Sequence, residues 1–203
     1  MRVNEIFYSL QGEGMRAGTA NVFVRFTGCN LRCATESGPL SPGGFDCDTE
    51  FASGRTMKPD EIVCAALELT GATFPGVILT GGEPLLQVTP ELVALFKNAG
   101  FSPICVETNG TVDPEGLGLD WITLSPKVAE HAVKVEHCNE SKYVRHVGQG
   151  IPKPVASADH YLISPAFTDH GLDRETLAWC IKLVKENPKW RLSVQQHKTW
   201  GVR

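Results

Sequence analysis

Short strand-like runs that alternate with helix-like segments constrain the fold of this 203-residue chain most strongly. Strands and helices in alternation are typical of an α/β fold with a mainly parallel sheet. The strand-like runs are Val22–Thr27, Val77–Thr80, Pro103–Glu107, Trp121–Leu124, Ser141–Val144, Tyr161–Ile163 and Arg191–Val194. At this length we expect a single domain over residues 1–203.

Three of the intervening segments carry helix start and stop signals. One begins at Pro59 and ends at Gly71, and a second begins at Thr89 and ends at Gly100. A third runs over residues 173–187. Three helices are too few for a complete eightfold barrel. We therefore expect an incomplete β/α barrel, with ligands bound at the carboxyl ends of the strands.

Three cysteines, Cys29, Cys33 and Cys47, follow the first of these strand-like runs. Three thiolates at a strand end suit an iron–sulfur cluster, because each can bind one iron. Structural zinc usually takes four Cys or His ligands, and a second C-x2-4-C pair is missing here. A disulfide is disfavoured because the chain has seven cysteines, an odd number, and its first residues do not resemble a secretory signal. From the cysteines alone, a metal site and buried thiols both remain open.

Charge and hydropathy exclude several classes of partner. The net charge of −4 gives no electrostatic reason to expect a nucleic-acid partner. No apolar run approaches the roughly 18 residues needed to span a membrane. We expect a cytoplasmic protein that binds neither nucleic acid nor membrane.

Polar motifs follow three of the predicted strands. Val77–Thr80 leads into Gly81–Pro84 (GGEP), Pro103–Glu107 leads into Thr108–Thr111, and Trp121–Leu124 leads into Ser125–Lys127. Each of the first two motifs alone is better explained by an ordinary turn, and Lys127 alone could equally be a solvated surface side chain. Together they place polar groups at neighbouring strand ends of one sheet, beside the cysteines.

This combination resembles the radical S-adenosylmethionine superfamily. Cys29 and Cys33 match the first half of its C-x3-C-x2-C signature, and Cys47 matches the second after a 13-residue insert. The resemblance implies that Cys29, Cys33 and Cys47 hold a [4Fe–4S] cluster. The GGEP segment matches the motif that meets the methionine amino group, so Gly82 and Glu83 are expected to bind S-adenosylmethionine. A side chain at Gly82 would be expected to block the cofactor and spare the cluster.

A narrower resemblance, to the 7-carboxy-7-deazaguanine synthase family, covers nearly the whole chain. The matching segments are Glu5–Gly14 (EIFYSLQGEG), Arg25, Thr27–Asn30, Asp46–Thr49, Thr80–Pro84, Glu107–Thr111, Ser125–Lys127, Trp190–Ser193 and Gln196–Lys198. The resemblance implies a radical lyase of 7-deazapurine (queuosine) biosynthesis. It would contract the ring of 6-carboxy-5,6,7,8-tetrahydropterin to give 7-carboxy-7-deazaguanine with loss of ammonia. A flavodoxin or ferredoxin as electron donor, Mg²⁺ as a further cofactor and a homodimer are implied as well.

The same resemblance implies roles for individual residues, with the chemistry left to the cluster and the deoxyadenosyl radical rather than to a catalytic side chain. Thr49 is expected to bind Mg²⁺. The expected cofactor-binding residues beyond Gly82 and Glu83 are Ser125, Pro126, Lys127, Ser164, Pro165, Ala166 and Phe167. The expected substrate-binding residues are Leu10, Gln11, Gly12, Arg25, Thr80 and Arg203, the last through its α-carboxylate.

Two alternatives are kept beside this interpretation. A glycyl-radical-enzyme activase would share the cluster and S-adenosylmethionine but act on a protein backbone. A zinc or iron–sulfur binding module would have no enzymatic activity. Cys64, Cys105, Cys138 and Cys180 lie outside every motif, and Cys64 and Cys180 are expected to be buried on helices.

Overall fold

The computed structural model describes residues 1–33, 52–71, 73–168 and 171–203. The strands are β1 (Arg2–Leu10), β2 (Ala20–Phe26), β3 (Arg55–Thr56), β4 (Gly76–Gly81), β5 (Ile104–Thr108), β6 (Trp121–Leu124), β7 (His137–Arg145), β8 (Ser157–Pro165), β9 (Phe167–Thr168), β10 (Gly171–Leu172) and β11 (Trp190–Leu192). The α-helices are α1 (Pro59–Thr70), α2 (Pro90–Asn98), α3 (Arg174–Glu186) and α4 (Gln196–Trp200). Short 3-10 turns are η1 (Gly14–Arg16), η2 (Pro84–Leu86) and η3 (Glu130–Ala132).

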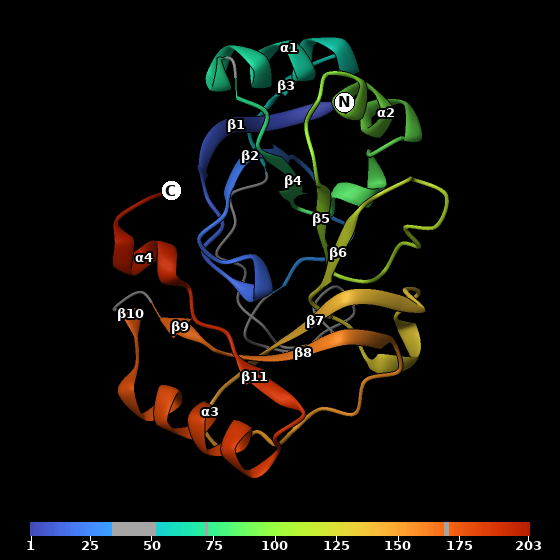
Figure 1. Cartoon of the computed structure of the whole chain (residues 1–203). Helices are drawn as coiled ribbons and strands as arrows, with labels where there is room; N and C mark the ends of the chain where they lie inside the picture. Colours follow the sequence, from blue (N-terminus) through green and yellow to red (C-terminus); the bar gives the residue numbers. More distant parts are fainter. Residues whose placement is uncertain (34–51, 72, 169–170) are drawn as a thin grey trace.

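Nine strands form one open sheet in the order β11-β8-β7-β6-β5-β4-β2-β1-β3. The pairs from β2 to β11 are parallel, whereas β1 pairs antiparallel with β2 and β3. Figure 1 shows α1 and α2 beside one end of this sheet and α3 beside the other. The predicted α/β architecture, with a mainly parallel and incomplete barrel, is confirmed.

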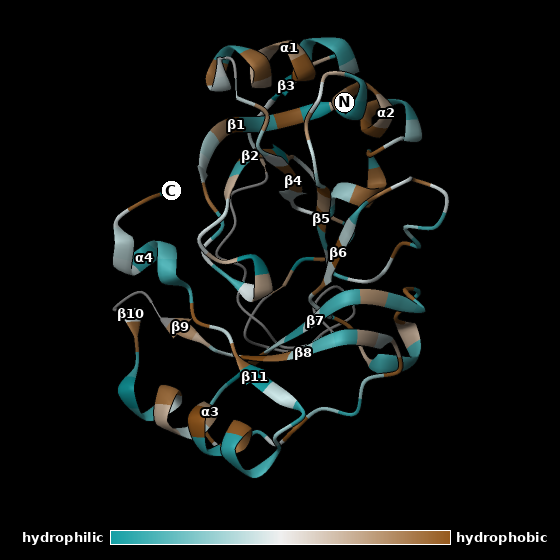
Figure 2. Cartoon of the chain, viewed as in Figure 1, coloured by the Kyte–Doolittle hydropathy of each residue, from teal (hydrophilic) through white to brown (hydrophobic). Residues whose placement is uncertain are grey.

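The three longer helices begin and end close to where the sequence signals predict. The side chain of Thr89 accepts a hydrogen bond from the Leu92 amide and caps α2. Asp173 caps α3 in the same way through the Thr176 amide. Figure 2 shows hydrophobic and hydrophilic residues mixed along α1, α2 and α3, as expected for helices that pack one side on a sheet.

The main hydrophobic core lies between α1, α2 and one face of the sheet. Phe26, Leu79 and Ile104 pack there with Ile62 of α1 and Phe96 of α2, and all five are almost fully buried. Side chains alternate between the two faces of a strand. The residues between these apolar ones therefore point to the opposite face, where a smaller apolar cluster that includes Phe7, Phe23 and Ile78 lies beside polar side chains.

Two details of the sequence prediction are wrong. Strand β1 was not expected, because the inward-facing Glu5 and Ser9 interrupt the apolar pattern by which strands are recognised. Cys64 was expected to be buried but is exposed, because the buried face of α1 is formed by Ile62, Val63 and Ala66. No helix among the described residues has both the length and the apolarity that a membrane crossing needs.

Candidate functional site

One polar row crosses the face of the sheet opposite α1 and α2. Strand register pairs Glu5 with Arg25, Arg25 with Thr80, and Thr123 with both Glu107 and Glu140. These pairs form two groups, one from Glu5 to Thr80 and one from Glu107 to Glu140. A hydrogen bond of 3.2 Å from Thr80 Oγ1 to Glu107 Oε2 joins the two groups. We call this set the polar row: Glu5, Arg25, Thr80, Glu107, Thr123 and Glu140.

Arg25 and Arg203, both expected to bind substrate, meet at one end of the polar row. Arg25 Nε lies 2.9 Å from Glu5 Oε1, with both side chains about one quarter exposed. The guanidinium of Arg203 pairs with the other oxygen of Glu5. The main-chain oxygen of Arg203 accepts a hydrogen bond of 2.8 Å from Ser9 Oγ. Two cations therefore share one carboxylate at a partly solvated position.

Gln11 and Thr80 both bind the carboxylate of Glu107. Gln11 Nε2 donates to Glu107 Oε1 at 2.8 Å, and Thr80 donates to the second oxygen. The oxygen of Gln11 accepts from the amides of Gly12 and Glu13 at 2.7 and 3.2 Å. The side chains of two residues expected to bind substrate are thus held by a third, Glu107, to which the sequence analysis gave no role.

The loop after β1 is held by segments distant in the sequence. The Gly12 carbonyl accepts from the Gln196 amide at 2.9 Å, and Gly14 N donates to Ser193 Oγ at 2.9 Å. A Cβ atom on Gly12 would lie 2.1 Å from His197 Nδ1, so only glycine allows this approach of α4. Met15 N donates to Glu140 Oε2 at 2.8 Å.

Glu13 and Lys142 form an ion pair in the interior beside this loop. Their side chains are only 14% and 11% exposed. Burial alone would raise the pKa of the Glu13 carboxyl, but the Lys142 ammonium lowers it below its usual value. Burial alone would lower the pKa of Lys142, but the charges of Glu13, Glu107 and Glu140 raise it. One lysine therefore balances a cluster of carboxylates.

The loop after β2 carries the first predicted cluster ligands, and we call its described part, residues 27–33, the cysteine loop. Cys29 and Cys33 are both half-buried within the same loop. The Leu31 amide donates to Cys29 Sγ at 3.4 Å. The third predicted ligand, Cys47, and the predicted Mg²⁺ ligand, Thr49, lie outside the described residues. No group of three potential metal ligands occurs among the residues that the structure describes.

The end of β4 is fastened to this cysteine loop through its backbone. Gly82 N donates to the Phe26 carbonyl at 3.1 Å, and Glu83 N donates to the Gly28 carbonyl at 3.0 Å. A Cβ atom on Gly82 would lie 2.0 Å from the Gly28 oxygen and 3.2 Å from Cys29 Cβ. A side chain at Gly82, expected from the sequence to spare the cluster, would therefore displace the loop that carries Cys29.

Glu83 has no exposed surface and is fully occupied by protein donors. Its carboxylate accepts hydrogen bonds from Leu85 N at 3.0 Å, Thr108 Oγ1 at 2.9 Å and Asn109 N at 2.7 Å. Burial raises its pKa, although these three bonds act in the opposite direction. We expected this carboxylate to contact an ammonium group directly. The structure corrects that expectation, because Glu83 instead joins the ends of β4 and β5.

We predict that Glu83→Gln lowers the free energy of unfolding by about 1–3 kcal/mol, because an amide nitrogen would face a backbone N–H and leave it without an acceptor. Denaturant unfolding of the apoprotein measures this loss. Glu68→Gln on the exposed side of α1, outside its first turn, is the matched control and should be neutral. Equal unfolding free energies for both variants would contradict the role of Glu83.

The other residues expected to bind the cofactor lie at two further strand ends. Ser125 follows β6, its amide donates to the Thr108 carbonyl at 2.8 Å, and its hydroxyl accepts from Lys127 Nζ at 3.0 Å. Ser164 and Pro165 end β8 and are buried, as is Ala166, whereas Phe167 is partly exposed beneath the ammonium of Lys198. All lie at the carboxyl ends of parallel strands, the same edge as Cys29.

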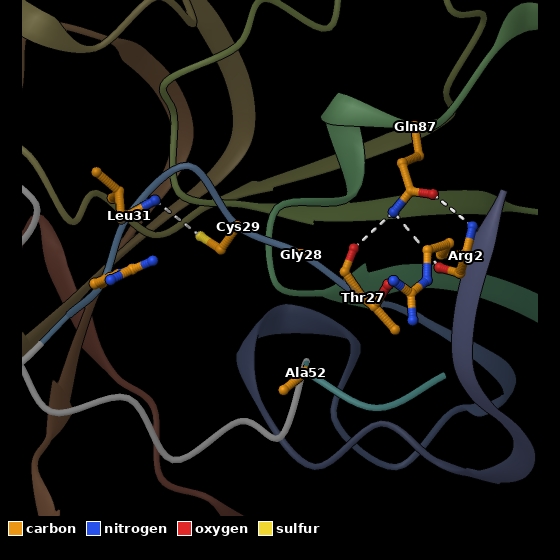
Figure 3. A pocket seen from close by; sticks show the side chains of 8 residues that line it. Arg2, Thr27, Gly28, Cys29, Leu31, Ala52 and Gln87 are labelled. Carbon is orange, nitrogen blue, oxygen red and sulfur yellow. Dashed lines mark hydrogen bonds between the residues drawn. The ribbon is translucent and has the colours of Figure 1, made fainter. Parts of the chain in front are cut away.

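A pocket with a volume of about 370 Å³ lies beside the cysteine loop. Figure 3 shows Cys29 and Leu31 on one side of it and Arg2 and Gln87 on the other. Gln87 donates to the Thr27 carbonyl at 2.6 Å and accepts from Arg2 N at 2.6 Å, which fixes the start of the cysteine loop to β1. The pocket borders the predicted cluster but not the polar row.

The remaining cysteines do not contribute to this site. Burial raises the pKa of the Cys105 and Cys138 thiols to about 12 and that of Cys180 to about 11. The expected burial of Cys180 on α3 is confirmed. Buried thiols with raised pKa values are poor nucleophiles and poor metal ligands at neutral pH.

Several polar residues of this site have no role assigned from the sequence. Glu107 and Asn109 were quoted only within a strand-end motif, and Glu13 only within the LQGEG segment. Lys142 lies in a predicted strand between buried residues, and a charged residue in such a strand is the signal that could have identified it. His197 matched a motif, but only the folded chain brings it against Gly12.

The residues present fit both a [4Fe–4S] cluster and S-adenosylmethionine. The donor set near β2 consists of the Cys29 and Cys33 sulfurs, which are half-buried at the strand-end edge, and cysteine sulfur is the usual ligand of such a cluster. Gly82 is only half-buried, so its backbone can meet a ligand at that edge.

Comparison with known proteins adds three findings. A family model for a 4Fe-4S single cluster domain matches residues 10–114. The chain is 38% identical to the 7-carboxy-7-deazaguanine synthase of Bacteroides thetaiotaomicron, over 100% of this chain and 98% of that protein. It is 39% identical to those of Bradyrhizobium diazoefficiens and Nitratidesulfovibrio vulgaris, over 99% of this chain and 98% of each relative. The crystal structure of QueE from Escherichia coli matches with a TM-score of 0.65 and 24% identity, over 97% of this chain and 94% of that one, and shows a shared fold.

Proposed function

This chain belongs to the 7-carboxy-7-deazaguanine synthase family of radical S-adenosylmethionine lyases, and we propose that it contracts 6-carboxy-5,6,7,8-tetrahydropterin to 7-carboxy-7-deazaguanine, with loss of ammonia, on the polar face of its sheet. Its cofactors are a [4Fe–4S] cluster and S-adenosylmethionine. When bound, they supply a radical that abstracts hydrogen from the substrate. The observation that carries the proposal is the polar row, because Arg25 and Thr80 lie near the carboxyl ends of β2 and β4, the strands that lead into the cysteine loop and into Gly82.

We assign the cluster to Cys29, Cys33 and Cys47, and the cofactor to the strand ends. Gly82 would offer backbone to S-adenosylmethionine, with Ser125, Pro126 and Lys127 after β6 and Ser164–Phe167 after β8 completing the edge. Glu83 acts indirectly in this proposal, by joining Gly28 to the end of β5. The common edge supports this assignment, because parallel strands present their carboxyl ends together.

The polar row suits the two chemical ends of a carboxypterin. The pyrimidine ring presents N–H donors, for which Glu107 is a charged acceptor held by Gln11 and Thr80. The carboxylate of the substrate needs a cation in a partly dry site, and Arg25 supplies it. We expect Leu10 at the end of β1, Gly12 in the loop that follows and Arg203 in the C-terminal segment to meet the substrate as well. We propose that Thr49 helps to place Mg²⁺ against the same carboxylate.

We predict that Arg25→Ala weakens pterin binding roughly ten- to a hundredfold, because a charge-assisted contact worth about 1.5–3 kcal/mol is lost. Equilibrium binding of the carboxypterin to the reconstituted protein tests both this prediction and the proposed function, since an activase would not bind a pterin. Arg174→Ala on exposed α3 is the matched control. Unchanged affinity in Arg25→Ala, with binding intact in the control, would remove Arg25 from the site.

Several features of this function remain predictions. A flavodoxin or ferredoxin is expected to supply the electron, and the chain is expected to act as a cytoplasmic homodimer of one domain per chain.

Thr49→Ala is expected to blunt the response of turnover to added Mg²⁺ without abolishing it, because water can replace one oxygen ligand. A titration of turnover against Mg²⁺ concentration in both proteins measures this difference. An identical Mg²⁺ response in both would separate Thr49 from the metal.

A further inference from the structure

The sulfur of Cys29 has a side-chain donor that comes from a different strand. Asn109, directly after β5, directs Nδ2 at Cys29 Sγ over 3.7 Å, a distance typical of an N–H···S hydrogen bond. The Leu31 amide donates to the same sulfur at 3.4 Å. One donor therefore belongs to the cysteine loop itself, and the other comes from the loop after β5.

The orientation of the Asn109 amide is fixed by its oxygen. Asn109 Oδ1 accepts from Thr111 N at 2.9 Å and from Thr111 Oγ1 at 2.6 Å. Because both bonds require an acceptor when Thr111 donates, the oxygen must face Thr111 and the NH₂ group must face Cys29. The same NH₂ group donates to Asn30 Oδ1 at 3.3 Å, which uses its second hydrogen.

The position of Asn109 is fixed as well. Its backbone amide donates to the buried carboxylate of Glu83 at 2.7 Å, and the residue is only 8% exposed. Asn30 Nδ2 donates to Thr111 Oγ1 at 2.7 Å, which ties the cysteine loop to the loop after β5 a second time. Because these bonds do not involve the sulfur, the Asn109 NH₂ group stays directed at Cys29 Sγ when the charge on the sulfur changes.

We propose that Asn109 is a positioning residue that sets the reduction potential of the cluster through its hydrogen bond to the Cys29 thiolate. Reduction adds one negative charge, which spreads onto the sulfur ligands. A donor aimed at a ligand sulfur stabilises the reduced form more than the oxidised form, and so raises the potential. This inference rests on the proposed role of Cys29 as a cluster ligand.

The test is an anaerobic redox titration of the reconstituted protein, followed by electron paramagnetic resonance in the absence of S-adenosylmethionine. Asn109→Ala removes the donor and should make reduction on the order of tenfold less favourable, a fall of about 59 mV for a one-electron couple. Asn109→Asp keeps the shape but replaces the donor by a negative charge, so its potential should fall further. Asn98→Ala, an exposed asparagine at the end of α2, should leave the potential unchanged.

The outcomes separate this inference from the assignment of the ligands. Full iron content in Cys29→Ala would overturn the ligand assignment, and the inference with it. Iron loss in Cys29→Ala, together with a potential in Asn109→Ala and Asn109→Asp equal to that of Asn98→Ala, would overturn the inference alone. If Asn109→Ala does not load iron, the potential of the better-matched Asn109→Asp decides between these outcomes.

Discussion

Gly82→Ala is expected to lose nearly all iron and all cleavage of S-adenosylmethionine, although Gly82 is not a metal ligand. The added Cβ atom would lie 2.0 Å from the Gly28 oxygen and 2.6 Å from the Gly28 carbonyl carbon. These are backbone atoms, so no side-chain rotation can relieve the overlap. The cysteine loop must move away from β4 and break the bond between Glu83 N and the Gly28 carbonyl. Cys29 moves with it.

Iron content after anaerobic reconstitution measures this effect, with circular dichroism to verify that the sheet remains folded. The matched control is Gly150→Ala, because a Cβ atom there meets no atom within 4 Å and the backbone conformation is ordinary. A Gly82→Ala protein with a full complement of iron and weakened cofactor binding would instead support the simpler role expected from sequence, in which this glycine only makes room for the cofactor.

Lys142→Met is expected to lower the free energy of unfolding by about 3–5 kcal/mol, which corresponds to a fall in melting temperature of roughly 6–20 °C. The substitution leaves the nearly buried carboxylate of Glu13 without its cation, and Glu107 and Glu140 lose the same neighbour. Thermal unfolding of the apoprotein measures the loss. Lys182→Met is the control, because Lys182 and Glu186 are both 58% exposed and such surface pairs contribute little.

The effect of Lys142→Met should depend on pH in a defined direction. The pKa of Glu13 is lowered in the native protein, so its contribution is present above its unfolded value of about 4.5 and is lost as pH falls. Without Lys142, burial raises that pKa and protonation relieves the charge. The stability difference between the two proteins should therefore shrink on acidification. Glu13→Gln combined with Lys142→Met should be more stable than Lys142→Met alone, and equal stability would contradict the ion pair as the cause.

Local sequence patterns predicted most strands and helices because those elements are coded by neighbouring residues. The helix limits at Pro59 and Gly71 are set by residues that begin and end helices in any context. Strand β1 escaped notice because Glu5, which belongs to the polar row, and Ser9 stand on either side of Phe7 where apolar residues would be expected. A functional surface therefore concealed the element that carries it.

The lateral arrangement of the site could not be predicted in the same way. Glu107 lies beside Thr80 and Thr123 because of the register between strands, which no local pattern specifies. The burial of Glu83 and the contact between Gly82 and Gly28 likewise depend on how two strand ends meet. Motif resemblance identified the segments that gather at this edge. The structure further distinguishes residues of these segments whose side chains can meet a ligand from residues, such as Glu83, whose side chains bond to other parts of the protein.

The most direct test of the account is the identity of the product. Anaerobically reconstituted protein, supplied with reductant, S-adenosylmethionine, Mg²⁺ and 6-carboxy-5,6,7,8-tetrahydropterin, should give a product with the mass of 7-carboxy-7-deazaguanine and release one ammonia for each molecule formed. Cys29→Ala should give none. If the intact protein cleaves S-adenosylmethionine but never converts the carboxypterin at any Mg²⁺ concentration, the proposed function is wrong and an activase that acts on a protein backbone becomes the better account.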